Sequence, residues 1–145
     1  MKVKIKKLHD DAVIPSYAKQ GDAGMDLTTI ENPNIKETYI EYDTGLSMEI
    51  PEGHVGFLFP RSSVSKTDLV LANCVGVVDS GYRGPVKLRF KIVGGCKTKN
   101  RDKDYKKGDR IGQIIIMPVP NFKFEEVDSL TDTSRGEGGF GSTGN

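Results

Sequence analysis

The sequence has no tryptophan, and only two cysteines and two histidines among its 145 residues. Cys74 and Cys96 are too few and too far apart for a cysteine-ligated zinc site. A disulfide between them is not expected in a reducing compartment, so we expect two buried thiols. His9 and His54 lack the close spacing of a histidine-ligated metal. A metal held directly by cysteine or histidine is therefore not expected.

The sequence also has almost no net charge, because it contains 21 basic and 20 acidic residues. Such a balance gives no sign of nucleic-acid binding through bulk charge. No apolar run approaches membrane-spanning length. The first residues, MKVKIKKL, alternate charged and apolar residues and differ from a signal peptide. We therefore expect one soluble, cytoplasmic domain that binds neither nucleic acid nor membrane.

Seventeen glycines and seven prolines divide the apolar residues into short stretches. No long window keeps a helical period, and only Ser62–Lys66 could form about one turn of helix. An all-β sandwich or barrel with short connections is therefore predicted. The clearest predicted strands are residues 3–8, 46–50, 55–59, 69–78, 86–93, 111–119 and 122–127.

Two segments differ from this pattern. Residues 97–109 carry many charges of both signs, which predicts a solvated hairpin tip. Residues 130–145 are polar and then rich in glycine, so they should be poorly ordered unless something ties them down. We therefore expect a β domain over residues 1–134 and a mobile tail over residues 135–145.

The tail combines features that suit a nucleotide. Its stretch GEGGFGST, residues 136–143, resembles a phosphate-binding loop with serine in place of lysine. Such a loop opens a helix, which we do not expect here, but free backbone amides can still cradle an anion. Arg135 would add a bidentate positive charge, and Phe140 a face on which a base could stack. We favour a nucleotide lid over the simpler alternative, a disordered terminus.

Four further segments combine glycine with charged or hydroxyl residues: AGMDL at 23–27, PRSS at 60–63, GVVDSGYRG at 76–84 and GDRIGQ at 108–113. With the tail, their order and spacing closely resemble the homotrimeric dUTP pyrophosphatase (dUTPase) family over nearly the whole chain. The resemblance implies a β jelly roll that hydrolyses dUTP to dUMP and pyrophosphate with Mg²⁺. It also implies a trimer with three active sites, each shared between subunits.

The resemblance assigns the nucleoside to the third segment. Asp79 would be the catalytic base that orients water towards the α-phosphorus, and it would accept a hydrogen bond from the sugar 3′-hydroxyl. Tyr82 would lie under the deoxyribose, where a ribose 2′-hydroxyl would clash. Taken alone, the aspartate could be a turn cap and the tyrosine a core residue. Uracil would be read by Asn73, Gly76 and Val78, with Phe140 stacked on it.

The remaining segments are assigned by resemblance to the phosphates and the metal. Asp26 would hold Mg²⁺ through water, because this ion keeps much of its hydration shell. We expect Asp109 and Arg110 to form an internal ion pair with a structural role. The predicted phosphate contacts are Arg61, Ser62, Ser63, Gln113, Arg135, Gly139, Ser142 and Thr143.

The chain departs from the family pattern at three places. Ser63 replaces a glycine, Gly112 replaces an alanine, and the charged loop before Gly108 is several residues longer. Arg-Ser-Ser also occurs in dCTP deaminase, a different enzyme of the same fold. Arg89, however, stands where that enzyme has its catalytic glutamate, and an arginine cannot serve as the acid and base. A non-catalytic nucleotide-binding regulator stays open as a further alternative.

Overall fold

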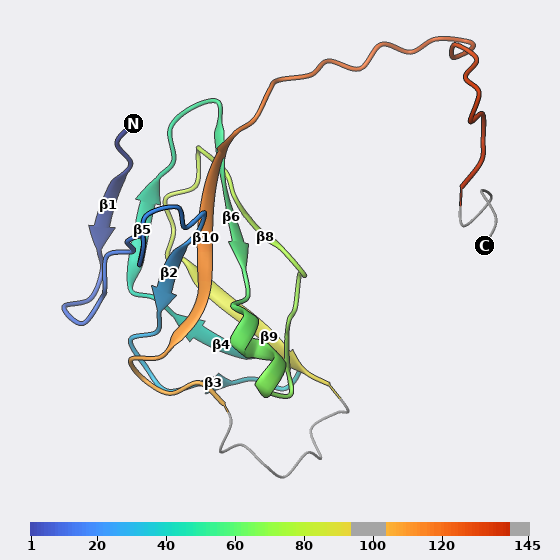
Figure 1. Ribbon diagram of the computed structural model, residues 1–145. Coiled ribbons are helices and arrows are strands. Elements are labelled where there is room, and N and C mark those ends of the chain that lie inside the picture. Colours follow the sequence, from blue (N-terminus) through green and yellow to red (C-terminus); the bar gives the residue numbers. More distant parts are fainter. Residues whose placement is uncertain (94–103, 140–145) are drawn as a thin grey trace.

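The computed structural model describes residues 1–93 and 104–139, and their regular secondary structure consists almost entirely of short β-strands (Figure 1). No helix in these ranges is long and apolar enough to span a membrane. The strands are β1 (Lys4–Lys7), β2 (Met25–Thr28), β3 (Asn34–Ile35), β4 (Ile40–Asp43), β5 (Leu46–Glu49), β6 (His54–Phe59), β7 (Leu69–Leu71), β8 (Gly76–Val78), β9 (Lys87–Ile92) and β10 (Arg110–Pro118), with a 3₁₀ helix η1 (Ser62–Lys66) after β6.

The strands form three antiparallel sheets. Their orders are β1-β5, β2-β10-β6-β8 and β3-β4-β9-β7. The nine-residue β10 lies between β2 and β6 in the second sheet and pairs with both. The prediction of an all-β fold is therefore confirmed, as is the short helical turn at residues 62–66.

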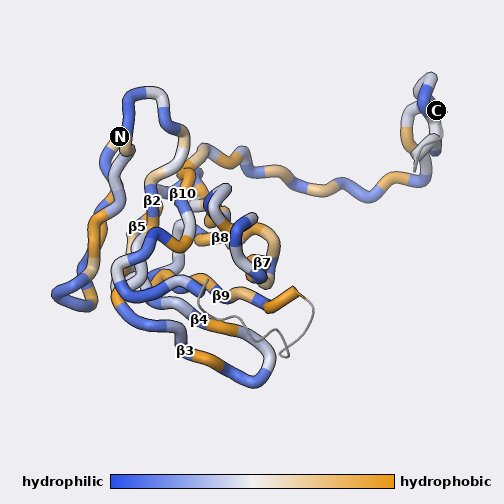
Figure 2. Tube along the Cα trace, turned by 60° about the horizontal axis from the view of Figure 1, so that its bottom comes forward, coloured by the Kyte–Doolittle hydropathy of each residue, from blue (hydrophilic) through white to orange (hydrophobic). Residues whose placement is uncertain are grey.

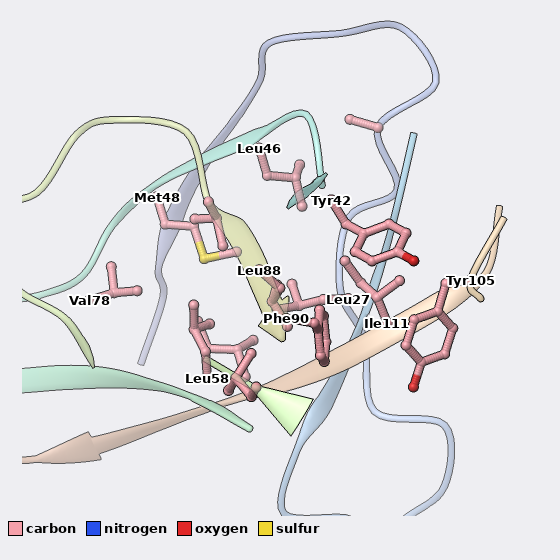
Figure 3. Close-up of a cluster of buried hydrophobic side chains, with 14 of the residues drawn as sticks. Leu27, Tyr42, Leu46, Met48, Leu58, Val78, Leu88, Phe90, Tyr105 and Ile111 are labelled. Atoms are coloured by element: carbon pink, nitrogen blue, oxygen red, sulfur yellow. The ribbon is translucent and has the colours of Figure 1, made fainter. Parts of the chain in front are cut away.

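The core lies between the two four-stranded sheets. Leu27 of β2 and Ile111 of β10 enter it from one side and Tyr42 of β4 and Phe90 of β9 from the other, and all four are fully buried (Figure 3). The Tyr42 and Phe90 rings meet edge to face, with their centroids 5.7 Å apart. Side chains alternate along a strand, so burial of Leu88 and Phe90 turns Arg89, the residue between them, outward.

Two of the predicted strands differ in the structure. Residues 69–78 form two strands, β7 and β8, with Cys74 in the turn between them. Cys74 is exposed and adopts a left-handed φ of 60°, so the prediction of a buried thiol is wrong for this residue. Cys96 lies outside the described residues. The predicted strand at residues 122–127 does not form, and the Phe122 and Phe124 side chains stand in solvent. A strand needs a paired neighbour, and this segment leads away from its own domain (Figures 1 and 2).

Of the predicted hairpin tip at residues 97–109, residues 97–103 lie outside the described residues. This segment does not join two neighbouring strands of one sheet. It follows β9 and precedes β10, and these strands belong to different sheets. At its described end, residues 104–109, Tyr105 is buried and meets the Tyr42 ring edge to face, with the centroids 5.8 Å apart. This burial raises the pKa of the Tyr105 phenol. The loop is therefore anchored in the core by an aromatic side chain.

Gly112, which replaces the alanine expected from the resemblance, is closely surrounded. A Cβ at this position would meet Leu88 Cδ2 and would lie 2.9 Å from the Phe59 carbonyl oxygen. The backbone oxygen cannot move without disturbing the β6–β10 pairing. Leu88 therefore fills the space that an alanine methyl would need.

We expect Gly112→Ala to lower the thermal midpoint, although alanine is the residue usual in the resembling family. Overpacking of this kind costs about 1–3 kcal/mol. Unfolding should be followed at one fixed protein concentration. Leu88→Val, which shortens the opposing side chain, should destabilise the Gly112→Ala protein less than it destabilises the wild type. Equal effects in the two backgrounds would contradict the proposed packing.

Candidate functional site

A cleft of about 690 Å³ opens beside β8, and a smaller pocket of about 190 Å³ adjoins it. Both are lined by Asn73, Gly76 and Tyr82, and the smaller one also by Val78 and Asp79. The structure thus brings together the nucleoside-binding residues predicted from its described part. We call the two cavities together the hairpin cleft. Phe140, the remaining predicted nucleoside contact, lies outside the described residues.

The loop after β8 holds Asp79 and Tyr82 through its backbone. The Tyr82 amide donates to the Asp79 carbonyl at 3.0 Å, and the Tyr82 hydroxyl donates to the Pro85 carbonyl at 3.0 Å. The Asp79 side chain is exposed and makes no hydrogen bond within residues 1–93 and 104–139. Asp79 is therefore no side-chain turn cap. Tyr82, 44% exposed, is not a core residue either.

Gly76 lets β8 approach β6 closely. A Cβ at Gly76 would lie 2.9 Å from the Leu58 Cβ, so a larger residue would push the two strands apart. Strand β8 lies at the end of its sheet and pairs only with β6. Half of its backbone donors and acceptors are therefore free to face a ligand.

A charge network forms the far wall of the hairpin cleft. Glu41 of β4 accepts hydrogen bonds from Lys87 at 3.1 Å and from Arg89 at 2.8 Å. Burial opposes ionisation of Glu41, but these two hydrogen bonds outweigh it and hold its pKa below the ordinary value. The Arg89 guanidinium also lies over the Tyr39 ring, 4.6 Å from its centroid.

Glu41 was not among the predicted site residues. It stands more than 40 positions from both cationic partners, so no local motif marks it. The one signal was a charged residue placed between the large apolar residues Ile40 and Tyr42. Each Glu41 carboxylate oxygen accepts a hydrogen bond from a cation, one from Lys87 and one from Arg89, so Glu41 is engaged within this network.

A second pocket, of about 290 Å³, lies between β2, β10 and the start of η1; we call it the arginine pocket. Its polar lining includes Asp26, Arg61, Ser62 and Gln113, all four of which were predicted. The Arg61 Nε donates to Asp26 Oδ1 at 2.8 Å, and the Gln113 amide donates to the Pro60 carbonyl at 3.2 Å. Ser63 follows on η1 and is half-buried outside the pocket lining.

Arg110 also belongs to the arginine pocket. Its Nη1 donates to Asp26 Oδ2 at 3.0 Å, whereas Asp109 accepts a hydrogen bond from the Lys106 amide at 2.7 Å. The predicted ion pair between Asp109 and Arg110 is therefore wrong, although both residues make internal contacts. The reason is that Arg110, at the start of β10, faces the neighbouring strand β2.

The carboxylate of Asp26 suits a water-mediated contact with a metal better than direct ligation. Each of its oxygens already accepts one hydrogen bond from a guanidinium, and each keeps a lone pair for a further donor such as a metal-bound water. No group of three or more histidine, cysteine, aspartate or glutamate side chains gathers in the described part of the chain. These residues fit Mg²⁺, which keeps several waters and takes phosphate oxygens as ligands.

Residues 119–139 lie apart from both sites. After β10 the chain leads away from the domain through residues 119–134, which we call the arm (Figures 1 and 2). The Arg135 Nε donates to the Gly138 carbonyl at 2.9 Å, and neither Arg135 nor Gly139 lines a cleft described above. Ser142 and Thr143 lie outside the described residues. The predicted site residues therefore fall into three groups within one chain.

Comparison with known proteins agrees with this arrangement. The family model described as dUTPase matches residues 10–144. A deoxyuridine 5'-triphosphate nucleotidohydrolase of Clostridioides difficile is 42% identical, over 98% of this chain and 97% of the relative. One of Nautilia profundicola is 41% identical, over 99% of each chain.

The fold is shared as well. The solved structure of Staphylococcus bacteriophage 80alpha dUTPase with dUPNHPP superposes with a TM-score of 0.80 at 29% identity, covering 99% of each chain. This similarity confirms the jelly-roll-like arrangement of the sheets. By sequence and by fold, the chain belongs to the dUTPase family.

Proposed function

We propose that the protein hydrolyses dUTP to dUMP and pyrophosphate by attack of water on the α-phosphorus. One observation carries this proposal. The hairpin cleft joins a sugar-sized tyrosine surface, a free backbone edge and the unengaged carboxylate of Asp79. Asp79 would accept the proton of the attacking water as the general base. The reaction would remove dUTP and supply dUMP for thymidylate synthesis.

Uracil would be read by the free edge of β8 and by the Asn73 side chain. At ring positions 3 and 4, uracil has a hydrogen-bond donor and an acceptor where cytosine has an acceptor and a donor. The wrong base would therefore leave buried polar groups unpaired. Backbone groups suit this task because they cannot rotate to accept the other pattern. Tyr82 would support the deoxyribose and exclude a 2′-hydroxyl.

The arginine pocket would bind the phosphates. Arg61 uses its Nε for Asp26, which leaves its terminal nitrogens to donate to phosphate oxygens. Ser62 and Gln113 line the same pocket and would add neutral donors, with Ser63 beside them. When bound, Mg²⁺ would neutralise the triphosphate charge, with Asp26 accepting hydrogen bonds from its waters. Arg135, Gly139, Ser142 and Thr143 would contribute from the tail.

We also propose that the active protein is a homotrimer with shared sites. The hairpin cleft and the arginine pocket have no lining residue in common among the described residues, which supports a site completed by a second copy. The arm leads away from its own domain and exposes Phe122 and Phe124. Burial of these two rings against a neighbour would favour assembly. The tail would then close over the site of another subunit, with Phe140 on the base.

The two alternative functions predict different products from the purified protein. A deaminase would release ammonia from dCTP, and a nucleotide-binding regulator would bind dUTP without turnover. Release of pyrophosphate from dUTP by the purified protein with Mg²⁺ supports the proposal over both. Binding of dUTP without pyrophosphate release would refute it.

The first functional prediction concerns the base. Asp79→Asn keeps the shape of the side chain but removes its capacity to accept a proton. We expect kcat to fall by about 10²–10⁴-fold, with the thermal midpoint nearly unchanged because the carboxylate makes no internal hydrogen bond. Steady-state pyrophosphate release measures the loss. Near-normal turnover of the variant would assign the base to another residue.

The second concerns the shared site and uses two inactive chains. One carries Asp79→Ala with an intact tail, and the other ends after Ser134. The two chains are unfolded and refolded together in equal amounts. A site then receives an intact Asp79 half of the time and, independently, an intact tail half of the time, so about one quarter of wild-type sites should be recovered. Each chain refolded alone is the control. No recovery in trimers proven to be mixed would show that hairpin and tail act within one chain.

A further inference from the structure

The position of the Tyr82 ring depends on the residue two places after it. A Cβ built on Gly84 would lie 2.6 Å from Tyr82 Cζ and 2.9 Å from Cε2, and nearer still to the phenolic oxygen. Non-bonded carbon atoms do not approach so closely. The ring therefore occupies the space that any side chain at position 84 would need.

The backbone does not explain glycine at this position. Five glycines of the described chain have a left-handed φ, and Gly84 is not among them. An alanine could therefore adopt its conformation. Gly81, on the same turn, also lacks a left-handed φ, and a Cβ there would meet nothing within 4 Å. What Gly84 provides is room for the Tyr82 ring.

That room fixes the ring where the proposed site needs it. Lying against Gly84, the phenol reaches the Pro85 carbonyl at 3.0 Å, while the exposed side of the residue lines the hairpin cleft beside Asn73. The ring is 44% exposed, so a methyl at position 84 can push it aside without unfolding the loop. The methyl would thereby move the surface on which the sugar rests.

We propose that Gly84 is a positioning residue which sets the discrimination between deoxyribose and ribose by fixing the Tyr82 ring. This inference rests on the proposed function, in which Tyr82 contacts the sugar. Gly84 itself touches no substrate. Its role is to leave space, so that the tyrosine ring can lie against the turn while the residue lines the cleft.

The test is the ratio of kcat/KM for dUTP to kcat/KM for UTP. In Gly84→Ala this ratio should fall roughly tenfold or more, because small displacements in a site have large effects on rate. KM for dUTP should rise, and the thermal midpoint should stay close to that of the wild type. Gly81→Ala, which adds the same methyl to the same turn in open space, should keep the wild-type ratio.

A second pair of variants separates positioning from general damage. In a Tyr82→Ala background there is no ring to displace, so adding Gly84→Ala should change the ratio no further. The same additional loss in both backgrounds would overturn the inference, since the methyl would then act without the ring. An unchanged ratio in Gly84→Ala alone would also overturn it.

A spectroscopic measurement keeps this test independent of turnover. With ¹³C-labelled tyrosine, the Tyr82 ring signal, assigned by its loss in Tyr82→Ala, should shift in Gly84→Ala and stay in place in Gly81→Ala. An unmoved signal in Gly84→Ala would overturn the inference. Absence of dUTP turnover in the wild type would instead refute the proposed function. A wild-type preference for dUTP with no change in Gly84→Ala would refute only the role of Gly84.

Discussion

A β-bulge in β10 sets the geometry of the arginine pocket. Arg110 pairs with Thr28 and Gly112 with Leu27, so β10 carries one residue more than β2 across this step. Residues three apart on a regular strand point to opposite faces. The extra residue corrects this alternation, so Arg110 and Gln113 both line the same pocket while Ile111 and Ile114 are buried. The spacing of GDRIGQ is thus explained by a strand with one irregularity. Without it, either an arginine would enter the core or an isoleucine would leave it.

Much of this fold could be predicted from the sequence, because its turn signals are clear. Glycine and proline mark the ends of β5, β6 and β9, and the apolar stretches between them became strands. The separation of β7 from β8 could not be predicted, because residues 69–78 are nearly continuous in hydrophobicity and the turn is made by Cys74, a residue with no turn preference. The predicted strand at residues 122–127 alternates only over residues 122–125, and it has no strand partner within residues 1–93 and 104–139. Sequence patterns report which segments can pair, but not whether a partner strand is present.

The candidate site shows the same division. Motifs identified Asp79, Tyr82, Asp26 and Arg61 because their residue types and spacing match a known chemistry. The contacts that hold them were not predictable: Glu41 reaches Lys87 and Arg89 only after β4 pairs with β9, and Arg110 meets Asp26 across another strand pair. Gly84 belongs to the same class, because its importance lies in the space it leaves beside Tyr82. Such residues become visible only once the atoms around them are placed.

The arrangement of charges around Asp26 also indicates how the phosphate site is prepared before a nucleotide arrives. Two guanidinium groups would repel one another in a small pocket, and the Asp26 carboxylate between them offsets that repulsion. It does so through Arg61 Nε and a single nitrogen of Arg110, which leaves the remaining donors of both side chains available. Asp22 also lines the pocket, so its two arginines are balanced by two aspartates, and the free guanidinium donors are held in a fixed geometry. On the proposed function, a triphosphate would meet donors that are already oriented, and less free energy would be spent on ordering them during binding.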